Sequence, residues 1–160
     1  MLTLFHLYTA VRGWDTMWPR YYLPNFDLSG KTVFDVGAGC GESAYFYFLH
    51  GASKVVAIEP NAFGFLEVNA KANDWNIEIL PRRFQLDDLL HIECDFVKMD
   101  CEGGEAELLK LDTDRFPHPG IIEVHNKEVA RKLLCKMTNL RCLGMNAARG
   151  YETVYYLGVP

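Results

Sequence analysis

The chain has 160 residues, 49% of them hydrophobic, which is enough for one domain with a buried core. Its formal net charge is -5 and no run of Lys or Arg stands out, so a nucleic-acid partner is disfavoured. The five cysteines form no C-x-x-C pair, which predicts reduced cytoplasmic thiols rather than a disulfide framework or a zinc cluster. The N-terminal residues lack the basic region of a signal peptide, and no membrane span is expected.

The beginning of the chain is rich in aromatic residues, among them Trp14 and Trp18. Apolar residues recur at helical spacing between positions 2 and 18, and Pro19 ends the pattern, which predicts an amphipathic helix. This helix could cover a ligand cleft, line a substrate site or form a homo-oligomer interface, although simple packing on the sheet edge explains the same pattern. We expect residues 1–30 to comprise this helix and a linker.

The strongest pattern in the chain lies between residues 32 and 60. An apolar strand reaches Asp35, a glycine turn at 37–41 and a helix follow, and a second strand ends on Glu59. Glycines permit backbone angles that are closed to other residues, and they let a flat ligand lie against the main chain. An acid at the position of Glu59 is suited to accept hydrogen bonds from ribose hydroxyls. The stretch therefore predicts a nucleoside-binding βαβ unit, with an ordinary tight turn as the alternative.

Glu42 bears on which nucleoside ligand is expected. A dinucleotide fingerprint needs Gly or Ala at this position, and a carboxylate there would repel a pyrophosphate. The pattern Asp35-x-Gly37-x-Gly39-x-Gly41 instead resembles the first motif of the class I methyltransferases, which use S-adenosylmethionine. That cofactor has no phosphate and carries a sulfonium cation, so acidic residues around the turn are compatible with it.

The rest of the chain predicts alternating helices and strands. Asn61 is the expected N-cap of a helix that runs to about Asn73, with Ala62, Phe65, Leu66 and Ala70 on its inner face. Asn126 is the expected N-cap of a later helix. Further strands are expected within 77–84 and at 96–99, 121–125, 140–145 and 153–157. A short helical segment is expected at 105–109. The last two strands have no helix between them and should pair as an antiparallel hairpin. The expected fold is a Rossmann-like, seven-stranded, mostly parallel sheet with helices on both faces and a C-terminal antiparallel hairpin.

Five motifs in this order resemble those of one branch of the class I methyltransferases, the FkbM-type family. They are Asp35 to Gly41, Glu59-Pro60-Asn61 with Asn69 and Asn73, Leu86 to Leu90, Val97 to Glu105, and Glu123-Val124-His125. The resemblance implies that residues 31–160 form a single methyltransferase-like domain. It also implies S-adenosylmethionine as the methyl donor and an oxygen acceptor on a small molecule, a sugar or a lipid-like compound.

The candidate site residues should converge at the carboxyl ends of the strands, where ligands bind in open α/β sheets. A hydroxyl acceptor needs a base, and His125 is the first candidate because imidazole titrates near neutrality. Asp100 and Glu102 are the alternatives, since they would share a face of an extended strand, although they could instead cap the helix near Gly104. The expected cofactor contacts are Asp35, Gly37, Ala38, Gly39, Gly41, Ser43, Glu59, Pro60, Asn61 and Asp100.

Other chemistries fit less well. Asp100, Glu102, Glu123 and His125 could bind a divalent metal, but no fixed ligand spacing supports this, and no metal is predicted. A methylase of nucleic-acid amines would carry Pro-Pro and an aromatic residue after the fourth strand, where this chain has Cys101-Glu102-Gly103. The main rival hypothesis is a non-catalytic module that binds S-adenosylmethionine without transferring its methyl group.

Overall fold

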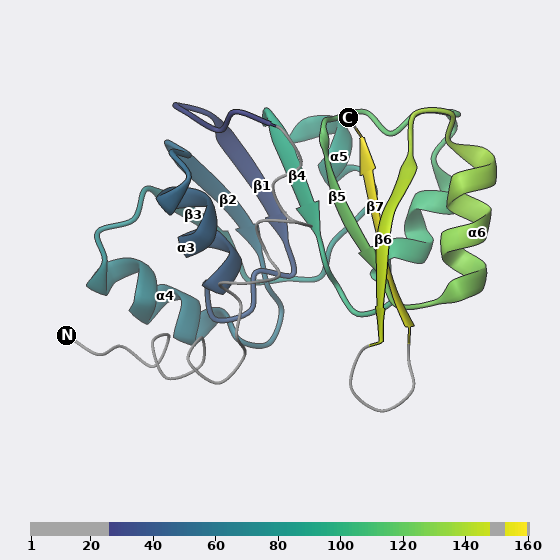
Figure 1. Cartoon of the computed structure of the whole chain (residues 1–160). Coiled ribbons are helices and arrows are strands. Elements are labelled where there is room, and N and C mark those ends of the chain that lie inside the picture. Colours follow the sequence, from purple (N-terminus) through teal and green to yellow (C-terminus); the bar gives the residue numbers. More distant parts are fainter. Residues whose placement is uncertain (1–25, 148–152, 160) are drawn as a thin grey trace.

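The computed structural model describes residues 26–147 and 153–159 (Figure 1). The expected N-terminal helix, with its suggested oligomer interface, lies outside these residues. The described part forms a seven-stranded sheet in the order β3-β2-β1-β4-β5-β7-β6, which confirms the predicted fold class. The strands are β1 (Thr32–Val36), β2 (Lys54–Ile58), β3 (Ile77–Leu80), β4 (Phe96–Met99), β5 (Gly120–Val124), β6 (Arg141–Ala147) and β7 (Thr153–Val159).

The first five strands are parallel to one another, and β7 is antiparallel to both β5 and β6. The carboxyl ends of the parallel strands therefore meet at one edge of the sheet, at the bottom of Figure 1. From β1 the chain goes to β2 on one side, whereas β4 lies on the other side. The connections that follow β1 and β4 thus lead to opposite sides of the sheet from its centre, which is where α/β sheets open a ligand crevice.

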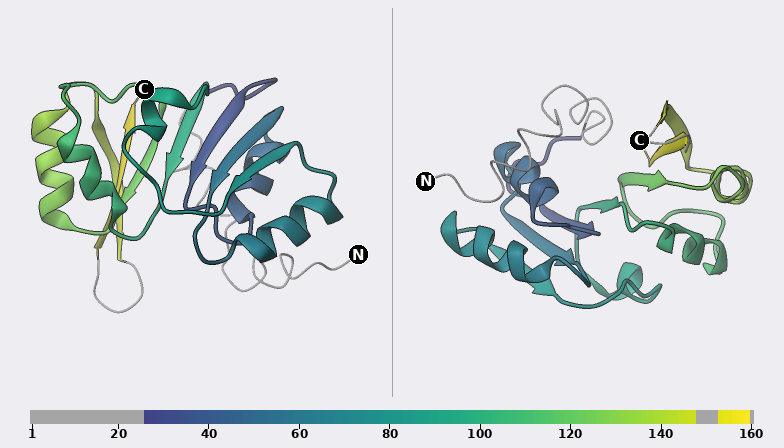
Figure 2. Two further views of the ribbon diagram at one scale, coloured as in Figure 1. Left: turned by 180° about the vertical axis from the view of Figure 1, so that it is seen from behind. Right: turned by 90° about the horizontal axis from the view of Figure 1, so that it is seen from below.

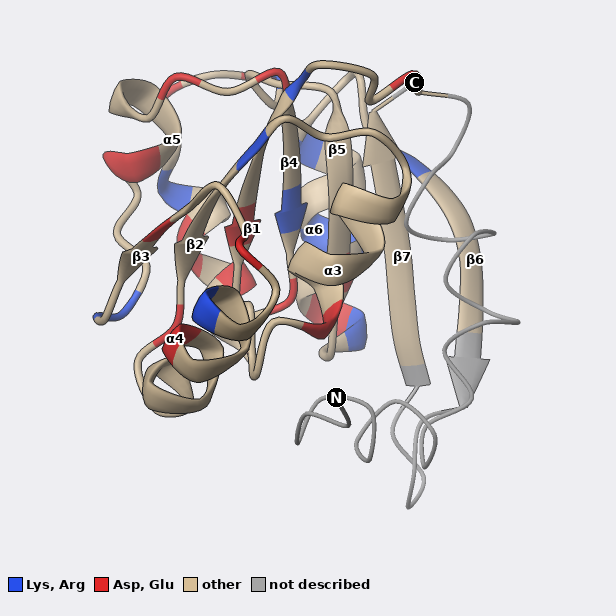
Figure 3. Cartoon of the chain, turned by 90° about the vertical axis from the view of Figure 1, so that its left-hand side faces the viewer, with Lys and Arg blue, Asp and Glu red and all other residues tan. Residues whose placement is uncertain are grey.

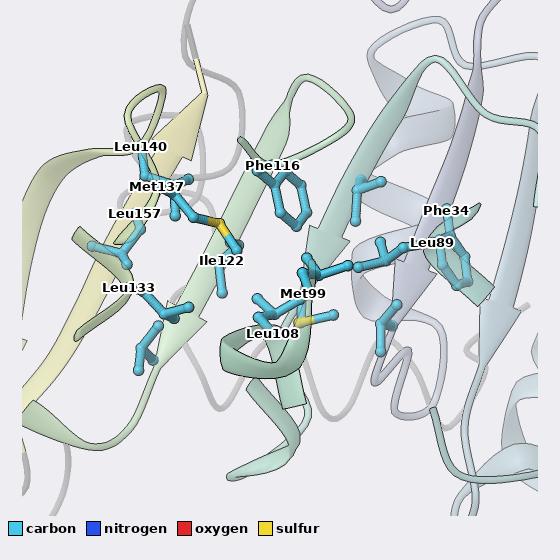
Figure 4. Close-up of a cluster of buried hydrophobic side chains, with 14 of the residues drawn as sticks. Phe34, Leu89, Met99, Leu108, Phe116, Ile122, Leu133, Met137, Leu140 and Leu157 are labelled. Carbon is cyan, nitrogen blue, oxygen red and sulfur yellow. The ribbon is translucent and has the colours of Figure 1, made fainter. Parts of the chain in front are cut away.

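Helices connect the strands and cover both faces of the sheet (Figure 2). Side chains on one face pack with helices α3 and α4, and those on the other face pack with α5, the 3-10 helix η1 and α6. Figure 4 shows the second core, in which Met99 and Ile122 of the sheet meet Leu108 of η1 and Leu133 of α6. The helices are α3 (Glu42–Leu49), α4 (Phe63–Ala72), α5 (Asp88–His91), η1 (Gly104–Lys110) and α6 (Lys127–Lys136).

Two local predictions about α4 were wrong. Asn61 does not cap this helix; the N-cap is Ala62, whose side chain makes no capping hydrogen bond. Phe65, expected on the inner face, is 52% exposed, because α4 rests on the core mainly through Leu66 and Ala70. By contrast, the side chain of Asn126 accepts hydrogen bonds from the N–H groups of Glu128 and Val129 and caps α6 as predicted.

Smaller differences concern the ends of elements. β3 ends at Leu80, earlier than expected, because Pro81 follows and has no N–H to continue the ladder. β4 ends at Met99, so Asp100 and Glu102 do not share the face of an extended strand; Glu102 has a positive φ of 51°. Among the described residues, no helix is long and apolar enough to cross a membrane.

The Arg82–Asp88 pair gives a first test of the structure. The carboxylate of Asp88 accepts hydrogen bonds from both terminal nitrogens of Arg82, at 2.9 and 2.7 Å, and from the backbone N–H of Gln85 at 2.8 Å. Burial would raise the pKa of Asp88, but these bonds hold it below its usual value. We expect Asp88→Asn to lower the free energy of unfolding by about 1 kcal/mol at pH 7.

This difference has a defined pH dependence. A lowered folded pKa gives stability that is present above the unfolded pKa of 3.8 and is lost as the pH falls through the folded pKa. Urea unfolding should therefore separate wild type from Asp88→Asn at pH 7 and bring them together in acid. Glu128→Gln, which breaks an exposed pair with Arg131, serves as the control and should change stability by less than about 0.5 kcal/mol.

Candidate ligand-binding and catalytic site

A buried ion pair lies beneath the glycine turn. Asp35 and Lys98 face each other in register on β1 and β4, with Nζ of Lys98 3.0 Å from Oδ1 of Asp35, and both side chains are almost fully buried. Ser43 of α3 donates its hydroxyl to Oδ2 of Asp35. Burial alone would lower the pKa of Lys98, but Asp35 and Asp100 more than offset it and raise the pKa above its usual value. Lys98 therefore keeps its positive charge.

Lys98 also fixes the start of the turn, because its Nζ donates to the carbonyl of Gly37 at 2.7 Å. Gly37 itself lies against the backbone that follows β4: a Cβ atom here would be 1.8 Å from the carbonyl oxygen of Asp100. Its φ of 77° also favours glycine. Gly37 therefore lets the two loops at the centre of the sheet approach each other, as the sequence pattern led us to expect.

Every backbone N–H of the turn from Gly37 to Gly41 is donated to an acceptor within the protein. Gly37 and Ala38 donate to the carbonyl of Ile58, and Gly41 donates to that of Ala38. Gly39 donates to Glu59 at 3.0 Å, and Cys40 to Glu42 at 2.8 Å. This loop thus has no spare N–H group for a phosphate, in contrast to the loops that bind dinucleotides.

At the end of β2, the side chain of Glu59 accepts hydrogen bonds from three backbone N–H groups. One oxygen accepts from Gly39, and the other accepts from Asn61 and Ala62 at 2.7 and 3.0 Å. The carboxylate is 7% exposed, and Pro60 and Asn61 follow it directly. Asn69 of α4 adds a further anchor by donating to the carbonyl of Cys40 at 2.9 Å.

A second group of side chains surrounds His125, which follows β5. Its Nε2 atom lies 3.6 Å from Asp100, 3.8 Å from Glu102 and 3.7 Å from Glu123, and its Nδ1 lies 3.6 Å from Glu105. Glu105 is almost fully buried and accepts from the N–H groups of two loop residues, Cys101 and Gly103. Acidic residues thus gather at the carboxyl edge of the sheet, the lower edge in Figure 3.

The charges in this group set the protonation of His125. Its interaction with Glu105, together with Asp100 and Glu102, raises the pKa of His125 to about 9 despite partial burial. Burial raises the pKa of Asp100, whereas His125 and the N–H of Cys101 hold the pKa of Glu105 below its usual value even though burial opposes this. An imidazole that keeps its proton at neutral pH cannot take another. The raised pKa counts against His125 as a proton acceptor.

The structure brings together most of the residues expected at the site and adds others that the sequence analysis missed. Ser43 is buried and points to Asp35, so it acts on the turn from beneath. Arg82 is paired with Asp88 and is not placed to steer an acidic acceptor. Lys98 was missed, although a lysine within the apolar β4 must have an acidic partner. The sequence analysis also missed three side chains that hold loop backbone by hydrogen bonds: Glu42 and Asn69 at the glycine turn, and Glu105 at the loop after β4.

A hollow of the described structure lies elsewhere. It has a volume of about 360 Å³ and is lined by the segment that leads into β5, by Asn139 and by Val159 at the end of β7. Because β7 is antiparallel to β5, these residues lie at the amino edge of the parallel strands. None of the candidate site residues lines this hollow.

The fold and this site can be compared with known proteins. No family model matches the chain. Over 91 residues it is 34% identical to the electron transfer flavoprotein beta subunit lysine methyltransferase of Homo sapiens. The aligned region covers 51% of this chain and 33% of that protein. The chain thus spans about a third of the length of that relative.

Solved structures share the fold over more of the chain. A ribosomal protein L11 methylase from Lactobacillus delbrueckii subsp. bulgaricus matches with a TM-score of 0.59 and 19% identity, over 96% of this chain and 79% of that chain. Fibrillarin of Aeropyrum pernix, with natively bound S-adenosyl-L-methionine, matches with a TM-score of 0.58 and 12% identity, over 84% and 70%. The fold is that of the class I methyltransferases.

The buried ion pair can be tested by breaking one side of it. Lys98→Met leaves the charge of Asp35 buried and removes the bond to Gly37, so we expect a loss of about 3–5 kcal/mol in the free energy of unfolding. The double variant with Asp35→Asn should recover much of this loss, because no buried charge then remains in the pair. Lys31→Met is the matched control, since its pair with Asp95 is exposed and should contribute less than about 1 kcal/mol. Equal losses in Lys98→Met and Lys31→Met, measured by urea unfolding, would contradict a structural role for the buried pair.

Proposed function

We propose that this protein is a methyltransferase that binds S-adenosylmethionine at the carboxyl edge of its sheet. The observation that carries the proposal is the glycine turn, whose N–H groups are all donated within the protein and two of which are donated to the carboxylates of Glu42 and Glu59. Such a turn suits a nucleoside ligand that has no phosphate and carries a positive charge. The shared fold and the likeness to a lysine methyltransferase support the same conclusion.

The residues present fit this cofactor. Oε2 of Glu59, which accepts only from Gly39, has a lone pair left and would accept a hydrogen bond from a ribose hydroxyl, next to Pro60 and Asn61. Gly37, Ala38, Gly39 and Gly41 offer a main-chain surface for the flat part of the ligand. Asp100 would face the positively charged methionine portion, while Asp35 and Ser43 hold the turn from below. The cofactor supplies the methyl group, which an acceptor takes by in-line displacement at the sulfonium.

The acceptor is expected beside Asp100, Glu102 and His125. Four carboxylates surround this histidine, so an anionic acceptor would be repelled, and a neutral hydroxyl or an amine is favoured. The FkbM-type motifs support an oxygen acceptor on a small molecule, sugar or lipid-like compound. The likeness to a lysine methyltransferase supports an amine instead. Asp100 would receive the proton from either kind of acceptor.

Calorimetric titration tests the cofactor. We expect micromolar binding of S-adenosylmethionine and S-adenosylhomocysteine and none of NAD. Glu59→Ala should weaken binding by about 1–3 kcal/mol, because a buried acceptor of ribose hydrogen bonds is lost. Glu67→Ala, which removes an exposed acid of α4, is the control. If neither sulfur compound binds the wild-type protein, the proposal is wrong.

Transfer of a labelled methyl group tests the catalytic role. Wild-type protein should label either a hydroxyl or an amine compound in an acceptor panel, and the labelled class decides between the two kinds of acceptor. Asp100→Asn should lower kcat by about 10²-fold or more, because the amide cannot take a proton. Protein that binds the cofactor but labels no acceptor would favour the non-catalytic binding module.

A further inference from the structure

The three oxygens that face Nε2 of His125 come from different parts of the loop and strand ends. Asp100 and Glu102 follow β4, and Glu123 lies near the end of β5. The N···O distances of 3.6, 3.8 and 3.7 Å are too long for hydrogen bonds, which place these atoms about 2.7–3.2 Å apart. Nε2 therefore faces all three carboxylates at distances beyond that of a hydrogen bond.

These separations are slightly longer than those between the ligands of a bound metal ion. Ligands about 2.0–2.2 Å from a tetrahedrally bound ion are about 3.3–3.6 Å from one another. Ligand atoms of Asp100, Glu102 and His125 all lie within 4.8 Å of one another. Each of the three could offer one atom to a common ion, which would draw the side chains together and displace the proton of His125.

A separate observation concerns the other nitrogen of the ring. Nδ1 of His125 is buried and faces Oε1 of Glu105 at 3.6 Å, so Nε2 is the nitrogen left to face the acids. Glu105 is itself fixed by the N–H groups of Cys101 and Gly103 at 3.1 and 2.9 Å. In histidines that bind metals, the other ring nitrogen commonly donates to a carboxylate, which sets the orientation of the ring and makes it a stronger ligand. Glu105 is the carboxylate beside Nδ1, and a small shift of the ring would bring the two within hydrogen-bond distance.

We propose that Asp100, Glu102 and His125 bind a divalent cation, with Glu105 as a positioning residue. One imidazole with carboxylates suits a borderline ion such as Mn²⁺ or Zn²⁺ better than an ion that prefers oxygen alone. On sequence alone these residues are possible ligands, but no metal is predicted because they follow no fixed spacing along the chain. The structure brings them together because β4 and β5 are parallel neighbours.

The place of the ion suggests a role at the site. Asp100 touches the glycine turn through its backbone, so a cation held by its side chain would lie beside the position proposed for the cofactor. An acceptor oxygen bound to such an ion would lose its proton more readily, and Asp100 would then hold the ion instead of taking the proton. This role rests on the proposed methyl transfer, whereas binding of the ion does not.

Binding of the metal alone is the first experiment. Protein stripped with EDTA and dialysed free of the chelator is titrated with Mn²⁺ and with Zn²⁺ by calorimetry, and Mn²⁺ binding is followed separately by electron paramagnetic resonance. We expect one ion per chain with micromolar affinity. Absence of stoichiometric binding of both ions would overturn the metal site. Titration of the same protein with S-adenosylmethionine reports independently on the proposed cofactor, so the two failures can be distinguished.

Variants then assign the ligands. Glu102→Gln is the most informative, because this side chain is 85% exposed and its replacement should leave the fold intact. We expect at least a tenfold loss of affinity in Glu102→Gln and in His125→Gln, and a loss of about 10- to 100-fold in the positioning variant Glu105→Gln. Glu107→Gln, an exposed acid of η1 paired with Lys110, is the matched control and should bind as wild type does. Unchanged affinity in both Glu102→Gln and His125→Gln would overturn the assignment.

Discussion

The ion pair between Asp35 and Lys98 is the interaction on which the candidate site depends. It joins the two central strands, it receives the hydroxyl of Ser43 from α3, and it holds the carbonyl of Gly37. Taking two charges out of water is costly, and a buried pair commonly stabilises a fold no more than apolar side chains would. What the pair supplies here is position. It links β1, β4 and α3 to the first residue of the glycine turn.

The rest of the site follows a common rule, in which carboxylates accept hydrogen bonds from backbone groups that would otherwise be free. Glu59 and Glu42 do this for the turn, and Glu105 does it for the loop after β4. The backbone N–H groups of the glycine turn and two in the loop after β4 are thereby occupied, and the carboxylates leave negative charge at this edge of the sheet. An edge of this kind is unsuited to phosphate and suited to cations. The cofactor and the metal ion proposed for this chain both agree with that charge.

Much of the architecture could be predicted because local patterns report local structure. Apolar runs gave the strands, Asn126 gave the start of α6, and the lack of a helix between the last two strands gave the hairpin. The errors arose where tertiary packing overrides the pattern. Phe65 fits an apolar stripe, yet α4 lies at the sheet margin and leaves it exposed. Asn61 is a residue type that commonly caps helices, but here Glu59 accepts the hydrogen bonds from the backbone N–H groups of Asn61 and Ala62.

The sequence by itself determined the order of the elements, the glycine turn and the acid at the end of β2, because each depends on residues that are close along the chain. Only the tertiary structure decided the protonation of His125 and the neighbours of Lys98. Charges act through space, and parallel pairing places Asp35 beside Lys98 and the acids after β4 beside the histidine after β5. The pKa of about 9 at His125 results from that arrangement, which no local pattern contains.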